Sequence, residues 1–222
     1  MLPPIAEFRF GDLILVRYIL GPMSVNTYLI FDKNKKEGIL VDPAWKEDSL
    51  IDRINDEKIS LPRVFLTHGH VDHIMALGYF KEKYNAKVFI SKEDSKMLVE
   101  PSKNLSEFLG EPISFEPADE YIKDGEEYLV GSFKFKTSLI PGHTSGGMAF
   151  DFKAFVLTGD TLFAGGVGRS DFPGGDHAIL IEKIWEKLML LPSDEPVFPG
   201  HGPESTVGRE KNSNPFFCFH KI

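Results

Sequence analysis

The sequence predicts one α/β domain over residues 1–222, with sheets inside and helices outside. In both halves of the chain, short apolar runs rich in β-forming residues alternate with amphipathic segments. No linker rich in Pro, Gly or Ser separates the halves, and the widely spaced clusters described below require both halves to meet around one centre. A chain of 222 residues with 42% apolar composition is long enough to bury one sizeable core.

The individual elements follow from the periodicity of the apolar residues. A helix is predicted over 46–55, where Ile51 and Ile54 lie on one face, and a second over 73–84. A third helix over 178–191 is predicted to begin at the capping residue Asp176. Short helical turns are predicted from Lys92 and over 105–110. The predicted strands are 8–10, 13–20, 27–31, 38–41, 63–66, 86–90, 127–130, 133–140, 147–152, 154–158 and 196–198.

The composition argues against several classes of protein. The formal net charge is −8, which disfavours a nucleic-acid partner because phosphate binding depends on Lys and Arg. The N-terminus lacks the basic start and long apolar run of a signal peptide, and the longest apolar runs are too short to cross a bilayer. We therefore expect a soluble, cytoplasmic protein without a membrane partner. The single cysteine, Cys218, can form no internal disulfide, and we expect a small packed or frayed residue without a catalytic role.

A cluster of histidines after the predicted strand 63–66 is the first sign of chemistry. The segment Thr67-His68-Gly69-His70-Val71-Asp72-His73 holds three of the chain's seven histidines. Imidazole and carboxylate groups bind zinc or iron without thiolates. His68 and His70 are two apart, so in a loop their rings can reach one metal, while Asp72 and His73 at a helix start can reach a neighbouring one. A chance cluster in a surface loop is the alternative.

Three further candidates each follow a predicted strand. His143 and His201 both stand in Pro-Gly-His turns, at 141–143 and 199–201, and the glycine permits a close backbone approach. Asp160 follows the apolar run 154–158, where a carboxylate is costly to bury unless it is paired or metal-bound. Each feature alone is typical of a solvated turn or a cap, but together with the histidine cluster they predict a metal site.

The order of these residues resembles the signature of the metallo-β-lactamase superfamily, and the resemblance covers nearly the whole chain. The resemblance implies an α/β fold that forms a four-layer αββα sandwich, with two divalent metal ions as cofactors. The ligands that it implies are His68, His70 and His143 for one ion, Asp72, His73 and His201 for the other, and Asp160 as the bridge between them.

Other stretches are similar to the glyoxalase II branch of this superfamily, namely 141–147, 159–163, 168–172 and the segment from 199 to 216. This resemblance implies hydrolysis of a small-molecule substrate, a hydroxyacyl-glutathione thioester, with zinc expected and iron or manganese acceptable. Full-length glyoxalase II carries a C-terminal helical extension that supplies basic residues to glutathione, and we expect no such domain here. It also has a tyrosine two residues after the last histidine ligand, where this chain has Pro203.

The implied mechanism assigns Asp72 and Asp160 as catalytic residues. Two ions lower the pKa of a shared water, so that hydroxide attacks the thioester carbonyl while Asp72 orients it. Asp42 matches a family aspartate that supports the site from behind its ligands, although it could equally be a turn residue that ends a strand. Arg169 and Asp171 either orient substrate or brace their own loop as an ion pair.

Other functions stay open at this point. An iron persulfide dioxygenase of the same fold would hold a single Fe(II) with His68, His143 and Asp160. The acidic net charge disfavours a nuclease of this fold, and the missing export signal disfavours a β-lactamase. The non-enzymatic alternative is a module that binds metal without turnover. The two remaining histidines, His177 and His220, are expected to lie outside the site.

Overall fold

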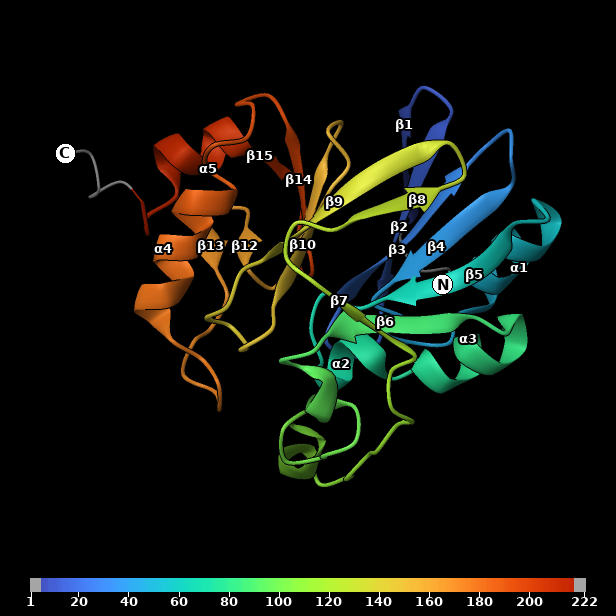
Figure 1. Cartoon of the computed structure of the whole chain (residues 1–222), viewed down its shortest axis with the longest axis horizontal. Helices are drawn as coiled ribbons and strands as arrows, with labels where there is room; N and C mark the ends of the chain where they lie inside the picture. The colour runs from blue at the N-terminus through green and yellow to red at the C-terminus, as the bar shows by residue number, and fades with distance from the viewer. Residues whose placement is uncertain (1–4, 218–222) are drawn as a thin grey trace.

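The strand β2 (Leu13–Leu20) is buried on both faces, and this explains the layered architecture. Leu13 and Leu15 pack into one cluster of buried side chains, whereas Ile14 and Val16 pack into another. Because successive side chains of a strand point to opposite faces, the sheet that contains β2 must be covered on both sides. In the computed structural model, which describes residues 5–217, helices cover one side and a second sheet covers the other (Figure 1).

Within residues 5–217, the first sheet has seven strands in the order β1 to β7. It is antiparallel from β1 to β4 and parallel from β4 to β7. Helices α1 (Asp48–Asp56), α2 (Val71–Ile74) and α3 (Leu77–Tyr84) lie in the connections between its parallel strands. The other strands are β1 (Ile5–Phe10), β3 (Val25–Asp32), β4 (Glu37–Val41), β5 (Ser60–Phe65), β6 (Lys87–Ser91) and β7 (Glu120–Ile122).

The second sheet has six strands among the described residues, in the order β15-β14-β11-β10-β9-β8. Helices α4 (His177–Lys187) and α5 (Val207–Ser213) cover its outer face, and the hairpin of β12 (Leu162–Phe163) and β13 (Gly166–Val167) stands beside it. The six strands are β8 (Glu127–Val130), β9 (Phe133–Leu139), β10 (Met148–Asp151), β11 (Val156–Gly159), β14 (Pro196–Pro199) and β15 (Ser205–Thr206).

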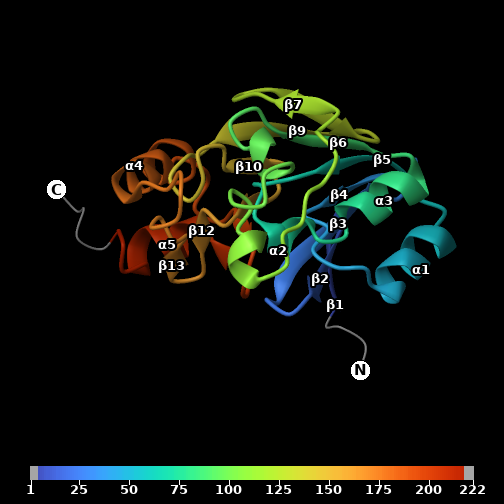
Figure 2. The ribbon, with the colours of Figure 1, turned by 90° about the horizontal axis from the view of Figure 1, so that it is seen from below.

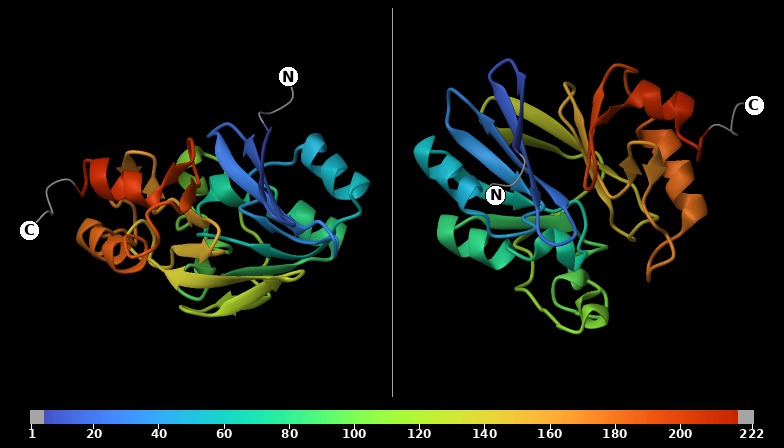
Figure 3. Two further views of the ribbon diagram at one scale, coloured as in Figure 1. Left: turned by 90° about the horizontal axis from the view of Figure 1, so that it is seen from above. Right: turned by 180° about the vertical axis from the view of Figure 1, so that it is seen from behind.

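Three separate cores lie between the four layers. Aromatic side chains such as Phe65, Phe135 and Phe150 fill the space between the two sheets and contact one another edge to face. A second core packs α1 and α3 on the first sheet, and a third packs α4 and α5 on the second. Figure 2 and Figure 3 show the two helical layers on opposite flanks of the paired sheets. The predicted four-layer α/β sandwich is therefore confirmed.

Some local predictions were wrong. The helix predicted over 73–84 is two helices, because the backbone N–H of Ala76 donates to Pro43 and the chain turns between α2 and α3. The last helix ends at Lys187 rather than at 191, although Asp176 caps it as predicted by accepting from the N–H of Ile179. Short turns do occur near the predicted places, at Ser95–Met97 and Ser106–Leu109.

The elements β7, β12, β13, β15 and α5 were not predicted; the four strands among them have only two or three residues each. Runs of this length carry no readable periodicity. Cys218 and His220 lie outside the described residues, so the predictions made for them stay predictions. Within residues 5–217, no helix has the length and apolar content needed to span a bilayer.

Candidate metal centre

The predicted ligands lie where strands of both sheets end along one edge of the sandwich. His143 follows β9, Asp160 follows β11 and His201 follows β14, and these three strands run in the same direction. The cluster that begins at His68 follows β5 of the first sheet. Backbone contacts join the two edges: Met148 donates to Thr67 at 2.8 Å. The sandwich therefore brings together residues that are more than 130 positions apart.

The first group consists of His68, His70 and His143, all at most 6% exposed. Nδ1 of His70 lies 3.0 Å from Nε2 of His143. Tetrahedral zinc with Zn–N distances of about 2.0–2.1 Å would place two ligand nitrogens roughly 3.3 Å apart, close to the spacing observed. Among the described residues, Nε2 of His68 is buried without a hydrogen-bond partner. A buried nitrogen of this kind needs a partner, and a cation between the three rings would supply one.

The second group consists of Asp72, His73 and His201. Nε2 of His73 lies 3.3 Å from Nε2 of His201, and that atom in turn lies 3.4 Å from Oδ2 of Asp72. Asp72 and His73 come from the short helix α2, whereas His201 comes from the loop after β14. Gly200 is required beside it, because a Cβ there would collide with Asp160 and with the ring of His73.

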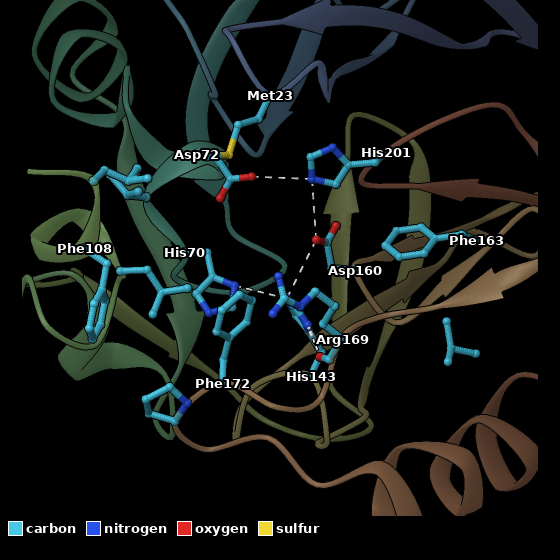
Figure 4. A pocket seen from close by; sticks show the side chains of 15 residues that line it. Met23, His70, Asp72, Phe108, His143, Asp160, Phe163, Arg169, Phe172 and His201 are labelled. Carbon is cyan, nitrogen blue, oxygen red and sulfur yellow. Dashed lines mark hydrogen bonds and ion pairs between the residues drawn. The ribbon is translucent and has the colours of Figure 1, made fainter.

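Asp160 stands between the two groups (Figure 4). Its Oδ1 lies 3.3 Å from Nε2 of His73, without the geometry of a hydrogen bond, and its Oδ2 lies 3.5 Å from Nε2 of His201 and 3.7 Å from Nε2 of His143. One carboxylate therefore contacts nitrogens of both groups. All seven predicted ligands come together, and the imidazole and carboxylate donor set fits divalent zinc, iron or manganese.

The ligand rings are held from behind by hydrogen bonds that select their tautomers. Oδ2 of Asp42 accepts from Nδ1 of His73 at 3.0 Å and from the hydroxyl of Thr67 at 2.6 Å. The carbonyl of Arg169 accepts from Nδ1 of His143 at 2.6 Å. In both histidines Nε2 is thus left free to bind a cation. Asp42 also directly follows β4 and has a φ of 50°. It is therefore both a turn residue at the end of a strand and a residue that supports the ligands.

The electrostatics of the site favour charged carboxylates and neutral rings in the group of His68, His70 and His143, whereas the nearby carboxylates outweigh burial and raise the pKa of His73 and of His201. Burial lowers the pKa of His68 far below its usual value and lowers the pKa of His70 to about 3. Burial would raise the pKa of Asp72 and of Asp160, but the nearby ring of His73 outweighs it and lowers both. Neutral imidazole and ionised carboxylate are the forms that bind metals.

Two predicted residues lie at the margin of this centre. Arg169 and Asp171 form a bidentate pair, with nitrogen–oxygen distances of 3.0 and 2.9 Å, and both side chains are about two-thirds exposed. The Arg169 guanidinium also lies 4.2 Å from the centre of the Phe172 ring. The pair braces its own loop, and Arg169 borders the cavity over the ligands. His177 contacts Phe216 away from the centre.

Asp94 is a buried residue that connects the two ligand loops and that was not predicted from the sequence. Its carboxylate accepts from the hydroxyl of Thr144 at 2.6 Å and from the backbone N–H groups of Gly69 and Gly146. Gly69 lies between two ligands and Thr144 follows a third. Burial raises the pKa of Asp94 to about 6. No motif marks Asp94, because its partners are 25 to 52 residues away in the chain.

A cavity with a volume of about 560 Å³, also not predicted from the sequence, opens onto the ligands (Figure 4). His70, Asp72, His143, Asp160 and His201 lie at its floor. Most of its remaining wall is apolar, and the side chains that form it include Met23, Leu105, Phe108, Phe163, Val167 and Phe172. They come from four separate segments of the chain, so no local pattern could reveal them.

Comparisons with known proteins agree with this geometry. The family model described as Metallo-beta-lactamase superfamily matches residues 20–201. Hydroxyacylglutathione hydrolase GloC of Haemophilus influenzae is 37% identical over 195 residues, covering 86% of this chain and 92% of that protein. The crystal structure of BLEG-1 B3 metallo-beta-lactamase has a TM-score of 0.85 and 32% identity, covering 91% of this chain and 98% of that one.

A second solved structure, TTHA1623 in a di-iron-bound form, has a TM-score of 0.78 and 31% identity, covering 90% of this chain and 98% of that one. The likeness therefore extends across both sheets and through every predicted ligand, since the match to the family ends at His201. The fold of the two solved structures is therefore shared with this chain over nine-tenths of its length. This chain belongs to the metallo-β-lactamase superfamily and is one of its metal-dependent hydrolases.

Proposed function

We propose that this hydrolase is a glyoxalase II-like thioester hydrolase that uses two metal ions, with hydroxyacyl-glutathione as its substrate class. The observation that carries the proposal is the position of Asp160, whose oxygens lie 3.3 to 3.7 Å from nitrogens of both histidine groups. A carboxylate placed in this way is suited to bridge two cations. The likeness to GloC, a hydroxyacylglutathione hydrolase, supports the thioester as the bond that is cleaved.

In the mechanism that we propose, two bound divalent ions would supply hydroxide near neutral pH and polarise the thioester carbonyl. Asp72 projects from α2 toward His201 and would orient the nucleophile. The thiol product has a pKa of roughly 8 to 9 and leaves as a thiolate without a general acid. This suits a cavity whose titratable lining residues, apart from Arg169, all belong to the predicted ligand set.

Zinc is the metal that we propose for both positions, because buried imidazole and carboxylate ligands are its usual partners in hydrolases. The di-iron form of TTHA1623 makes iron the competing metal. The second group, Asp72 with His73 and His201, favours two ions over one. A mononuclear iron dioxygenase would need only His68, His143 and Asp160 and would leave that group without a role.

Elemental analysis of the purified protein, together with a lactoylglutathione hydrolysis assay, tests this proposal. We expect two zinc ions per chain and release of free glutathione. One iron per chain, with oxygen consumed when a persulfide is added, would favour the dioxygenase instead. Two bound metals without hydrolysis of any thioester or ester would overturn the enzymatic proposal and leave a metal-binding module.

A further inference from the structure

We propose that the acyl group of the substrate is a long apolar chain, held in a groove that runs from the metal ligands past Met23 and Leu109 to Trp45. This inference rests on the proposed thioester hydrolysis and deepens it, because it names the acyl class. It departs from the short, polar lactoyl group that a glyoxalase II substrate carries. Four observations support it.

The first observation is the shape of the surface next to the ligands. The cavity of about 560 Å³ over the centre adjoins a second one of about 220 Å³. Met23, Val71, Asp72 and Leu109 line both of them. The second cavity continues away from the ligands to Trp45. A chain that begins at a carbonyl beside Asp72 can therefore extend along one continuous apolar wall.

The second observation is where exposed apolar side chains gather. Within residues 5–217, ten large apolar side chains are exposed, and four of them border these two cavities. Phe108 is 73% exposed, Leu109 57%, Met23 45% and Trp45 41%. Single exposed apolar residues are ordinary, but a contiguous set around a cavity marks a binding surface. Figure 4 shows Met23 at the top beside Asp72 and Phe108 at the left, on the side of His70.

The third observation is that hydrogen bonds hold the segment that carries Phe108 and Leu109. Leu105 has a φ of 70°, which is uncommon for a side chain of its size. The buried side chains of Asn104 and Ser106 hold the segment by hydrogen bonds to the backbone of Ile113 at 2.9 Å. A segment that is held by such hydrogen bonds and exposes two apolar side chains next to the metal centre is suited to bind an apolar chain.

The fourth observation is the charge of the groove. Apart from the predicted histidine ligands, Arg169 is the one basic residue among the described residues that line either cavity, and Asp171 already engages its guanidinium on two nitrogens. Glu111, an acid, lines the outer cavity. The two carboxylates of glutathione would find little to bind there. If glutathione is the thiol, the groove is left to the acyl group.

The test compares acyl groups on one constant thiol. Lactoyl-, butanoyl-, hexanoyl-, octanoyl- and decanoylglutathione are assayed with the metal-loaded protein below the micelle concentration. We expect kcat/KM to rise about three- to fourfold for each methylene that the groove buries. Decanoylglutathione should exceed lactoylglutathione. A flat or falling series, in a protein that does cleave thioesters, would overturn the groove and leave the proposed hydrolysis intact.

Substitutions in the groove test whether it causes the rise of kcat/KM with acyl length. Phe108→Ser and Leu109→Ser should reduce the gain from butanoyl to decanoyl several-fold. Leu190→Ser is the matched control, because Leu190 is 77% exposed and lines neither cavity; it should keep the full gain. An unchanged gain in both groove variants would contradict the inference.

A binding measurement keeps the inference testable if no thioester is cleaved. Decanoate added to the protein should change the fluorescence of Trp45, and the change should disappear in Trp45→Phe but persist in Trp185→Phe. Binding of decanoate without hydrolysis of any thioester would contradict the proposed function and support the apolar groove as a binding site. If the fluorescence does not change and kcat/KM does not rise with acyl length, the inference that the groove binds an acyl chain is contradicted.

Discussion

The carboxylate of Asp42 accepts the Nδ1 proton of His73 at 3.0 Å, from the side of the ring opposite the metal centre. Oδ1 of the same carboxylate accepts the backbone N–H of Thr67 at 2.8 Å. Asp42 therefore fixes both the tautomer of one predicted ligand and the start of the loop that carries two others. A bond of this type orients a metal-binding imidazole and raises its basicity.

Replacement of Asp42 by asparagine should weaken metal binding. The amide can still accept one hydrogen bond but no longer favours the proton on Nδ1 of His73. We expect metal affinity to fall about 10- to 100-fold, measured by elemental analysis after dialysis against a chelator. Asp32→Asn is the control: Asp32 also ends a strand and is 1% exposed, but the groups that donate to it, the backbone of Asn34 and Lys35 and residue Ser132, are no part of the metal centre. Equal metal loss in both variants would refute the role of Asp42.

Replacement of Asp160 by alanine should remove metal and activity together. Its two oxygens contact nitrogens of both histidine groups, so no other residue can take over the bridge. Metal content and thioester turnover are measured on the same sample. Asp171→Ala, at an exposed aspartate of the neighbouring loop, should keep its metal. Full turnover with normal metal content in Asp160→Ala would rule out the bridge.

Replacement of Asp94 by alanine should loosen two ligand loops at once. It leaves Gly69, Gly146 and the hydroxyl of Thr144 without their acceptor. Buried donors without partners cost about 1–3 kcal/mol each, so we expect the free energy of unfolding to fall by about 2 kcal/mol or more, with loss of metal. Urea denaturation and elemental analysis measure the two effects.

Asp119→Ala serves as the comparison for this variant. Asp119 accepts the backbone N–H of Val88 at 2.8 Å, and it lies away from the ligands. It should lose stability but keep its metal. If Asp94→Ala also kept all of its metal while losing stability, Asp94 would be a purely structural residue.

Replacement of Glu195 by glutamine should stabilise the protein at alkaline pH. Burial, and then the neighbouring Asp151, raise the pKa of this 5% exposed carboxyl to about 7 from the ordinary 4.5. The folded chain therefore holds a proton that the unfolded chain has released, and the free energy of unfolding falls as the pH rises from about 4.5 to about 7.

Glutamine has no charge to develop, so Glu195→Gln should exceed the parent in stability by up to about 3 kcal/mol at pH 8 and by little at pH 4.5. Urea midpoints at both pH values measure the difference. Glu127→Gln, at an exposed carboxyl on β8, should show no such dependence on pH. A constant difference across the range would exclude the buried charge as its cause.

Much of the fold could be predicted from the sequence because the long strands have a recognisable apolar pattern. β2 and β3, with eight residues each, are mostly apolar. Asp176 marks the start of α4, because its side chain caps the helix by a hydrogen bond to a residue three positions away. The hairpin of β12 and β13 gave no such signal. Glu210 and Asn214 of the distant α5 region hold it by hydrogen bonds to Gly165 and Gly166. Those contacts exist only after the chain has folded.

The sequence alone determined which donor groups the chain carries and in which order. Three histidines and an aspartate within six residues, followed by two Pro-Gly-His turns and an aspartate after an apolar run, predict a nitrogen and oxygen site for a divalent cation. That information is local, because ligand chemistry belongs to each side chain by itself.

Only the tertiary structure decided how those donors are used. Nδ1 of His70 faces Nε2 of His143 across 73 residues of chain, and Asp94 connects two loops that are 75 residues apart. The apolar groove combines Met23, Trp45 and Leu109, which lie far apart in the sequence. Such relationships depend on how two sheets pack against each other. Packing of this kind is a property of the whole chain, and it leaves no mark on any short stretch of it.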